Sequence, residues 1–407
     1  MPGRWMPRRN WRCPTRAIAT APTRPFHQLS TPSIQSTQRR QAIARRSRNN
    51  LQTNHIGTRT LFTESLPPVL IPPAIFLGLL LALWTWKCFW IVVLQDKLLY
   101  LSWLPPLSRS ESISDYEGEF RGVKWTERSM RSLDGTRLAV CEGRVSLDPP
   151  QSGRLKRLVI VCYFQGNGGS TPLRLPLLSQ VLGAMKEASA MGPGSGDAEY
   201  VLVALSYRGY WKSGGRATQS GIELDAEAFL AWVSETYGQP GRELRVVLWG
   251  HSLGAAVASS AVVKRLACPA TEGAIAPPIA GLVLEAPISS IKDMLVSLYP
   301  QKWLPYRYLW PFSWNKWDIA ETLEQMAIVS RSDSVSGGRA APPIFLLSAD
   351  SDEVIPMWVA DQLEDKARSL GLDIQRKSVK SAMHIEGPLK LDGRKALVDF
   401  IINSGNR

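Results

Sequence analysis

Residues 250–254 read GHSLG and match the G-x-S-x-G pattern, which can hold a nucleophilic serine. The pattern follows the apolar run Leu244 to Trp249 and opens a stretch of small residues, Ala255 to Ala261. A strand that turns sharply into a helix strains the serine backbone, and glycine on each side avoids clashes. We therefore expect Ser252 to be a nucleophile at the end of a strand, where the Leu253 amide can stabilise an oxyanion.

A nucleophilic serine needs a base, and the chain contains only four histidines. His27 and His55 precede an apolar segment near the N-terminus, and His251 lies within the serine motif, where we expect it to pack beneath the turn. His384 lies in the loop between the last predicted strand, Asp373 to Val379, and the final helix. Elimination therefore predicts that His384 is the base, with an exposed spectator histidine as the alternative.

The acid that orients the histidine should lie between Ser252 and His384 in the chain. The segment SADSDEVIP follows the penultimate predicted strand and offers Asp350 and Asp352. We select Asp352, because an Asp two residues before an apolar-Pro step lies in a tight turn and can hold the imidazole tautomer. Asp350 is then a turn-capping residue and the first alternative, and Glu285, at the end of an earlier strand, is a more distant one.

A second oxyanion amide is expected from the loop that follows the predicted strand Leu158 to Phe164. This loop, residues 165–170, reads QGNGGS, and its glycines allow the backbone to approach a reacting carbonyl closely. We expect the Asn167 amide to act together with that of Leu253. An ordinary glycine-rich turn is the alternative, whereas a nucleotide-binding loop is excluded because the G-x-G-x-x-G spacing fails.

Continuous apolar runs alternate with helical patterns after residue 120. Such runs are typical of strands in a parallel sheet that helices cover on both faces. The predicted strands are Leu158–Phe164, Tyr200–Tyr207, Leu244–Trp249, Ile279–Glu285 and Ile344–Ser348, and the predicted helices are Ile222–Tyr237, Ala255–Leu266 and Met357–Leu370. Segment Ala190 to Asp197 is expected to be a variable loop.

Residues 287–341 do not continue this alternation of strand and helix patterns. They contain many tryptophans and tyrosines among prolines. We expect them to form a helical, aromatic-rich cap over the serine, ending in a flexible surface loop from Ser330 to Ala341. An apolar cap suits a fatty-acyl chain. The alternative is that the aromatic side chains form only the core of the cap itself.

Positive charge is concentrated at the N-terminus. The first 60 residues hold 12 arginines and no acidic residue, and the rest of the chain carries 36 basic against 35 acidic residues. The nearly neutral remainder offers no basic face for nucleic acid. Residues 1–65 lack periodic apolar residues, so we expect a disordered tail; a mitochondrial presequence is the alternative, although six prolines would interrupt its helix.

Residues 69–94 form an apolar segment in which Ala74 to Leu94 give 21 positions with Lys87 as the single charge. That length predicts one transmembrane helix, and a buried or interfacial helix of a soluble protein is the alternative. Arginines precede the segment and acidic residues follow it, so we expect a single-pass protein with a cytosolic N-terminus. We expect the endoplasmic reticulum membrane, with a mitochondrial membrane as the alternative.

Five sequence blocks carry a resemblance to a known family: YFQGNGGS, SYRGYWKSGGRATQSGIELDAEAFLAWV, WGHSLGAAVA, LVLEAPISSI and SADSDEVIP. From about Val123 to the C-terminus the chain resembles the membrane-anchored α/β-hydrolases of the abhydrolase-domain group, which includes monoacylglycerol and lysophosphatidylserine lipases and their fungal relatives. The resemblance implies Ser252 as nucleophile, Asp352 as acid and His384 as base. Gln165 stands where the family usually has histidine, and the H-x-x-x-x-D acyltransferase signature is absent.

Taken together, the sequence predicts an α/β-hydrolase domain over residues 120–407 with a mostly parallel sheet flanked by helices. The cap insert of residues 287–341 lies within it, and the tail 1–65 and the transmembrane helix 69–94 precede it. The expected activity is hydrolysis of carboxylic esters, such as monoacylglycerols or lysophospholipids, at the membrane. A catalytically silent scaffold, a thioesterase and a peptidase are the alternatives, and the widely spaced cysteines predict neither a metal site nor any cofactor.

Overall fold

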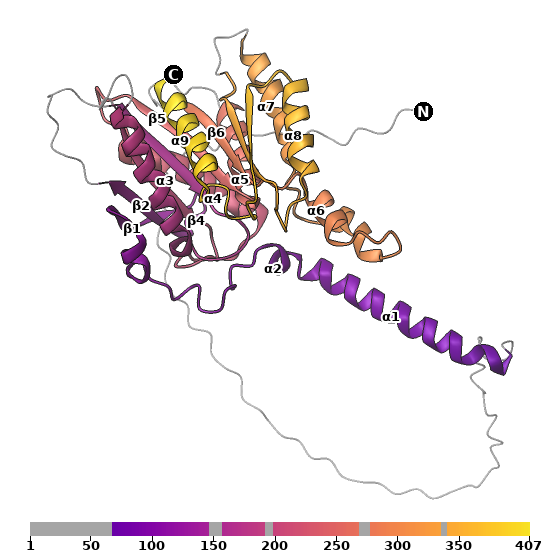
Figure 1. Ribbon diagram of the computed structural model, residues 1–407. Helices are drawn as coiled ribbons and strands as arrows, with labels where there is room; N and C mark the ends of the chain where they lie inside the picture. The colour runs from indigo at the N-terminus through magenta and orange to yellow at the C-terminus, as the bar shows by residue number, and fades with distance from the viewer. Residues whose placement is uncertain (1–66, 146–156, 192–197, 268–276, 335–339) are drawn as a thin grey trace, which may run out of the picture. The chain divides into compact units, whose positions relative to one another are not determined.

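The apolar runs of the sequence pair into one eight-stranded sheet with the order β1-β2-β4-β3-β5-β6-β7-β8 (Figure 1). The computed structural model describes residues 67–145, 157–191, 198–267, 277–334 and 340–407 and divides into two units, 1–79 and 80–407. The expected disordered tail, 1–65, lies outside the described residues. The strands are β1 (Val123–Arg131), β2 (Arg137–Val145), β3 (Arg157–Phe164), β4 (Ala198–Ser206), β5 (Leu244–His251), β6 (Ile279–Glu285), β7 (Ile344–Ala349) and β8 (Ile374–Val379).

The sheet is parallel from β4 to β8 and antiparallel where β2 joins β1 and β4. The continuous apolar runs correspond to the parallel strands, as the prediction of a sheet covered on both faces requires. The antiparallel edge is not predicted by those runs, because β1 mixes buried and exposed positions. The predicted mostly parallel α/β sheet is therefore confirmed, with one additional hairpin at its edge.

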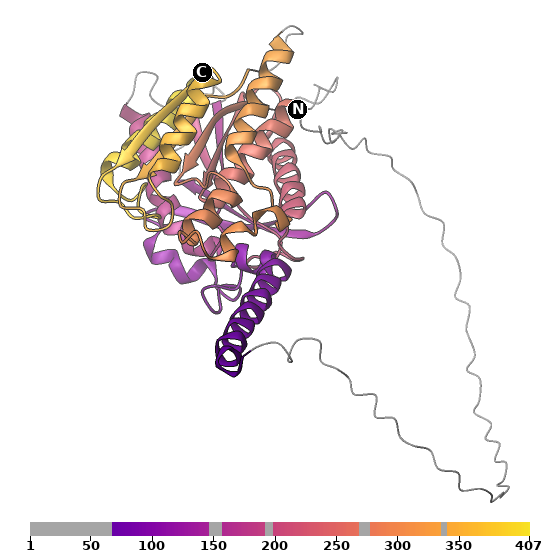
Figure 2. The same ribbon diagram turned by 90° about the vertical axis from the view of Figure 1, so that its right-hand side faces the viewer.

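Helices cover both faces of the sheet (Figures 1 and 2). Alternate residues of β3 belong to two different core clusters: Ile160 packs with the α4 side, whereas Val161 packs with the α3 side. Helices α3 and α9 lie over one face, and α4, α5, α7 and α8 lie over the other. The helices of the domain are α2 (Gln95–Leu99), α3 (Thr171–Met191), α4 (Gln219–Tyr237), α5 (Leu253–Ala267), α6 (Ile291–Leu298), α7 (Ile319–Ser334), α8 (Trp358–Ser369) and α9 (Leu391–Asn406).

One residue connects β5 to α5. Ser252 has a φ of +53°, in the left-handed region that residues with a side chain rarely adopt. A Cβ at Gly250 would lie 2.3 Å from the Gly254 carbonyl oxygen, and one at Gly254 would lie 2.1 Å from that of Phe164. The turn therefore excludes side chains at both glycines and holds α5 directly against the end of β3.

The expected cap insert of residues 287–341 divides into two parts. Its first part contains α6 and two short 3-10 helices, Pro305–Tyr308 and Trp310–Phe312. Its second part is α7, whose buried Leu323 and Met326 join the core beside α5, so α7 belongs to the layer of helices that covers the sheet.

The prediction of a surface loop from Ser330 to Ala341 is wrong for its first five residues, which belong to α7. Asp318 explains why the helix forms, because its carboxylate accepts the Glu321 N–H at 3.0 Å and caps the first turn of α7. Residues 335–339 of the expected loop lie outside the described residues, as do residues 192–197 of the expected loop Ala190 to Asp197.

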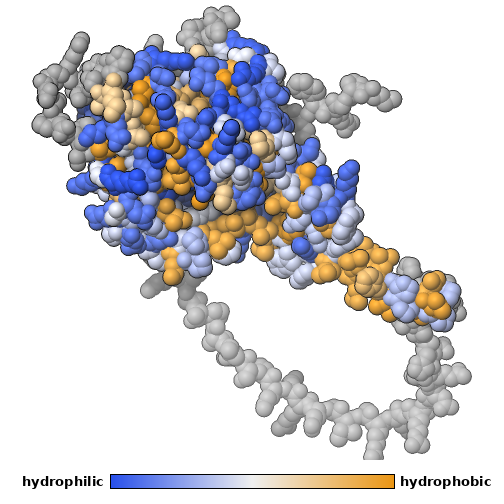
Figure 3. All heavy atoms as spheres, viewed as in Figure 1, coloured by the Kyte–Doolittle hydropathy of each residue, from blue (hydrophilic) through white to orange (hydrophobic). Residues whose placement is uncertain are grey.

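The apolar segment near the N-terminus forms α1 (Ile71–Val93), which a short 3-10 helix, Pro68–Leu70, precedes. Together they give 26 residues that are long and apolar enough to cross a membrane, and none of their most apolar window is buried. Figure 3 shows hydrophobic side chains along this helix. The absence of burial does not fit the buried form of the soluble-protein alternative, and its interfacial form stays open.

Gly254→Ala should destabilise the domain by about 1 to 3 kcal/mol or more, because the new methyl group overlaps the Phe164 carbonyl oxygen. The matched control is Gly183→Ala in α3, where a Cβ would meet nothing within 4 Å. That control should raise the stability by about 0.5 to 1 kcal/mol, as alanine does in helix interiors. Urea unfolding followed by circular dichroism measures both changes, and equal stability of the two variants would contradict the close approach.

Candidate active site

Three residues predicted to do chemistry follow the carboxyl ends of parallel strands. Ser252 follows β5, Asp352 follows β7 and His384 lies in the loop after β8. Since the carboxyl ends of parallel strands meet at one edge of a sheet, the fold brings the three segments to the same edge. Ser252 is 5% exposed and His384 is 8% exposed, and the side chain of Asp352 is 4% exposed.

Asp352 holds one nitrogen of the His384 ring. His384 Nδ1 lies 2.8 Å from Asp352 Oδ2 and 3.0 Å from Oδ1. The Asp352 carboxylate is itself fixed, because Oδ1 accepts the N–H groups of Val354 and Ile355 at 2.8 and 2.7 Å. The other aspartate of this loop, Asp350, accepts the Ser351 hydroxyl at 3.1 Å instead. The geometry thus pairs His384 with the selected carboxylate and leaves Nε2 free of that contact.

Backbone contacts from the β7 loop hold the histidine loop. The N–H of His384 donates to Glu353 Oε2 at 3.0 Å, and the N–H of Ser351 donates to the Ala382 carbonyl at 3.1 Å. Glu353 was missed by the sequence analysis, although it directly follows the selected Asp352. Glu353 thus fixes the backbone of His384, and Asp352 orients the side chain of the same residue.

The loop that follows β3 lies directly against the serine. A Cβ at Gly166 would be 3.5 Å from Ser252 Cβ and 3.0 Å from His251 Nδ1, so glycine leaves this side of the serine open. The Asn167 carbonyl accepts the Leu101 N–H at 2.8 Å and the Tyr210 hydroxyl at 2.9 Å. These two bonds fix the backbone of Asn167 in the loop that flanks Ser252.

Within the described residues, no hydrogen bond joins the Ser252 hydroxyl to His384. Such contacts are often long or poorly aligned in enzymes without substrate and tighten only when substrate binds. The Ser252 N–H donates to the Glu285 carbonyl at 2.8 Å, which ties the backbone of the serine to the end of β6.

Glu285, the more distant candidate for the acid, has other partners. Its carboxylate accepts the Trp249 indole N–H at 2.8 Å and forms an ion pair with Arg174 of α3. Its side chain is only 1% exposed, and that of Arg174 is 14% exposed. Glu285 therefore belongs to a buried charged pair beneath the serine turn.

Arg174 connects this pair to the histidine loop and was also missed by the sequence analysis. It donates to the Ile385 carbonyl at 3.3 Å, one residue after His384. Burial by itself would lower the pKa of Arg174, but the Glu285 carboxylate raises that pKa above its usual value. The guanidinium therefore stays charged and links β6 to the loop that carries His384.

His251 packs beneath the turn, as expected. Its ring centroid is 5.0 Å from that of His384, and its Nε2 is 3.4 Å from the His384 carbonyl oxygen and 4.0 Å from Glu285. Burial, with contributions from Arg174 and His384, lowers the pKa of His251 well below its ordinary value. His251 is therefore neutral at pH 7 and supports the loop rather than acting as a second base.

Gln165 is buried at the start of the loop that carries Asn167. Its side-chain oxygen accepts the Thr171 hydroxyl at 2.8 Å, and its backbone carbonyl accepts the Tyr207 hydroxyl at 3.0 Å. Its side-chain nitrogen is buried without a hydrogen-bond partner. Gln165 thus anchors the loop through its oxygen atoms.

The described part of the chain contains no group of three His, Cys, Asp or Glu side chains that could hold a metal. Cys141 and Cys162 are buried in the sheet, and burial raises the pKa of both thiols. A buried thiol with a raised pKa is a poor nucleophile. The serine is therefore the best-placed nucleophile of this site.

The family whose sequence profile matches the chain is described as "Alpha/beta hydrolase family", and the match covers residues 169–379. This range contains Ser252 and Asp352 and ends five residues before His384. A crystal structure of an alpha-beta hydrolase from Vibrio vulnificus has the same fold, with a TM-score of 0.53 at 15% identity, and covers 76% of this chain and 92% of its own.

Several curated proteins are similar to the chain. Lysophosphatidylserine lipase ABHD12 of Danio rerio is 30% identical over 210 residues, which are 51% of this chain and 47% of the lipase. The WAV2 protein of Arabidopsis thaliana, an alpha/beta hydrolase domain-containing protein, is 26% identical over 73% of this chain and 83% of its own length. Protein bem46 of Schizosaccharomyces pombe is 23% identical over 64% of this chain and 71% of its own length.

Arg174→Met should destabilise the protein by about 3 to 5 kcal/mol at pH 7, because it leaves the Glu285 carboxylate buried and unpaired. The matched control is the double variant Arg174→Met/Glu285→Gln, which removes that charge and keeps an acceptor for Trp249. The double variant should recover most of the free energy of unfolding that the single variant loses, as measured by urea unfolding.

The loss of folding stability in Arg174→Met should also become smaller as the pH falls. Burial raises the pKa of Glu285, so its unpaired carboxyl can take up a proton in the folded state before it would do so in the unfolded chain. Equal stability of the single and double variants at pH 7 would contradict a charged pair at this position.

Proposed function

Because this chain belongs to the alpha/beta hydrolase family, we propose that it is a serine hydrolase that cleaves carboxylic esters through Ser252, His384 and Asp352. The observation that carries the proposal is the bond from His384 Nδ1 to Asp352 at 2.8 Å, at the same sheet edge as the strained turn that bears Ser252. A nucleophile, a base and an orienting acid are the three groups that acyl transfer requires.

In the proposed mechanism, His384 donates its Nδ1–H to Asp352 and presents Nε2 as the base. Nε2 removes the proton from Ser252 as Oγ attacks the ester carbonyl, and the resulting oxyanion accepts the N–H groups of Leu253 and Asn167. His384 then passes the proton to the leaving alcohol, which leaves an acyl group on Ser252. Water activated by the same nitrogen releases the acid and restores the serine.

We propose that the substrates are single-chain lipid esters, such as monoacylglycerols or lysophospholipids. Three observations support this: the similarity to a lysophosphatidylserine lipase, the apolar helix Pro68–Val93 and the exposed aromatic side chains of the cap. An anchored enzyme meets lipid esters at the bilayer surface, where an apolar cap can receive an acyl chain.

A catalytically silent scaffold is the second candidate. The observation in its favour is that no hydrogen bond joins Ser252 to His384 among the residues that the structure describes. A reactive-serine probe separates the two functions, because only a serine activated by a base reacts at neutral pH.

A fluorophosphonate probe should label Ser252 of the full-length protein, and Ser252→Ala should abolish the labelling. Asp352→Asn should slow it by roughly 10³- to 10⁴-fold, because an asparagine holds the wrong imidazole tautomer. Asp350→Asn is the matched control, since Asp350 contacts Ser351 rather than His384, and should label close to the wild-type rate. Labelling is followed by gel fluorescence and mass spectrometry.

Folded wild-type protein that is not labelled would support the scaffold. A slower reaction of Asp350→Asn than of Asp352→Asn would instead assign the acid to Asp350. In both cases circular dichroism must first establish that each variant is folded.

We propose that the protein crosses the endoplasmic reticulum membrane once, with its N-terminus in the cytosol. The arginines before α1 and the acidic residues after it support this orientation. The sequence contains no N-x-S/T acceptor, so engineered acceptors report topology against a clean background.

An acceptor introduced between residues 192 and 197 should be glycosylated in microsomes, whereas one near Thr20 should not. The reason is that only the luminal side of the membrane holds the transferase. A gel shift that endoglycosidase reverses measures the modification. Glycosylation near Thr20 alone would indicate the opposite topology. Import of the protein into mitochondria with removal of its N-terminal tail would support the mitochondrial alternative.

A further inference from the structure

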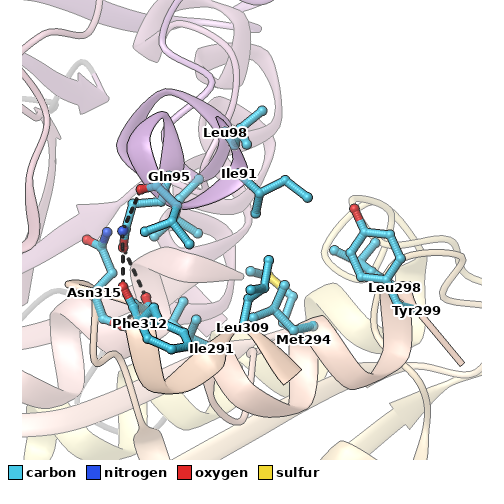
Figure 4. Close-up of a pocket in the computed structure, with 14 residues that line it drawn as sticks. Ile91, Gln95, Leu98, Ile291, Met294, Leu298, Tyr299, Leu309, Phe312 and Asn315 are labelled. Atoms are coloured by element: carbon cyan, nitrogen blue, oxygen red, sulfur yellow. Dashed lines mark hydrogen bonds between the residues drawn. The ribbon is translucent and has the colours of Figure 1, made fainter. Parts of the chain in front are cut away.

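A cavity of about 280 Å³ lies between residues 91–99 and the cap (Figure 4). One wall comes from the last turn of α1 and from α2, including Ile91, Leu98 and Leu99. The opposite wall comes from α6 and the 3-10 helix Trp310–Phe312, including Met294 and Phe312. Most of the side chains that face the cavity are apolar, so it suits an apolar ligand.

The side chains of Gln95, Ser313 and Asn315 in the cavity wall already have hydrogen-bond partners. Gln95 accepts the Trp314 N–H at 2.6 Å and the Ser313 hydroxyl at 3.2 Å, and it donates to the Phe312 carbonyl at 3.3 Å. Asn315 donates to Asp96 at 2.8 Å. A ligand headgroup would have to break these bonds, whereas an alkyl chain would not.

Both walls of the cavity are continuous in the chain with segments of the proposed catalytic site. Leu99 lies two residues before Leu101, whose N–H donates to the Asn167 carbonyl at 2.8 Å. On the other side, Ile291 closely follows Ala286, which lines a small second cavity together with Asp352. The cavity is therefore built from segments that continue, within a few residues, into contacts with the loop of Asn167 and with the second cavity beside Asp352.

The cavity also begins where the apolar helix ends. Ile91 belongs to the last turn of the 26-residue stretch that is long enough to cross a membrane. One turn earlier, Lys87 Nζ lies 4.3 Å from the centroid of the Tyr306 ring in the cap, so contact between helix and cap extends beyond the cavity. Exposed side chains of the cap next to it, Trp303 and Trp314, are of the type that lies at membrane interfaces.

We propose that this cavity binds the acyl chain of a membrane lipid ester, and that residues 91–99 are part of the substrate site. This inference rests on the proposed hydrolase function. An acyl chain would pass from the bilayer along α1 into the cavity without crossing water, and its ester would lie toward Ser252. For an ester that reaches the cavity from water instead, each methylene that the cavity holds should improve kcat/KM about fourfold, from the free energy of its transfer out of water.

The first test measures ester chain-length selectivity with the full-length protein in phosphatidylcholine nanodiscs. Met294→Trp and Ile91→Trp fill the cavity from opposite walls, and p-nitrophenyl butyrate and laurate serve as substrates. Both variants should lower the laurate-to-butyrate ratio of kcat/KM at least tenfold. The matched control, Ile328→Trp, changes an exposed position of α7 that is 63% accessible and should leave the ratio unchanged.

The second test does not depend on activity. A monoacylglycerol ether with a diazirine in its alkyl chain is photo-crosslinked in the same nanodiscs, and the labelled peptides are mapped by mass spectrometry. Label should appear within residues 91–99 and 291–299 and be lost in Met294→Trp. A non-hydrolysable ether without the diazirine should compete with it.

The two tests separate the failure of this inference from failure of the proposed function. Hydrolysis that depends on Ser252 together with an unchanged ratio, or crosslinks confined to residues 74–86, would overturn the acyl site and leave the hydrolase intact. Specific crosslinks in the cavity without any hydrolysis would overturn the hydrolase and retain a lipid-binding site.

Discussion

The close contact between the start of α5 and the end of β3 is the constraint on which the rest of the site depends. A Cβ at Gly254 would lie 2.1 Å from one β3 carbonyl oxygen and 2.5 Å from that of Gln165, so only glycine permits this approach. The contact places the start of a helix, with its unpaired N–H groups, beside the loop of Asn167. It also fixes Ser252 in a left-handed conformation that an unconstrained chain would leave. Packing of the backbone, rather than any side-chain contact, thus sets the position of Ser252.

The buried ion pair of Arg174 and Glu285 is a second contact that positions the segments of Ser252 and His384. Two buried charges are a poor source of stability, because the cost of removing them from water offsets most of their attraction. Their placement is more informative: Glu285 ends the strand whose carbonyl holds the Ser252 N–H, and Arg174 reaches the carbonyl next to His384. The pair joins two loops that no regular sheet hydrogen bond connects. It therefore contributes to the relative position of the segments that carry Ser252 and His384.

The sequence was informative where chemistry imposes a local pattern. The glycines around Ser252 and the scarcity of histidine identified the residues that the fold brings to one edge, and continuous apolar runs identified the parallel strands. Arg174 could not be found in this way, because one arginine in a helix reads as a surface residue until the fold buries it. The helical residues after Ser330 were misread, since a serine- and arginine-rich composition hides the continuation of α7. The cavity could not be predicted from the sequence either, because segments far apart in the sequence form its walls.

Tyr100 shows how deeply the polypeptide that leaves α1 enters the α/β-hydrolase domain. It is 2% exposed, donates to Asn315 at 2.6 Å and accepts the Trp317 indole N–H at 2.9 Å. The apolar helix α1 is therefore not an interchangeable module attached through a neutral linker. Recombination that joins this domain to a different anchor, or to a secretion signal, would have to keep the stretch from Gln95 onwards. This architecture restricts how descendants of the gene could lose or exchange the apolar helix.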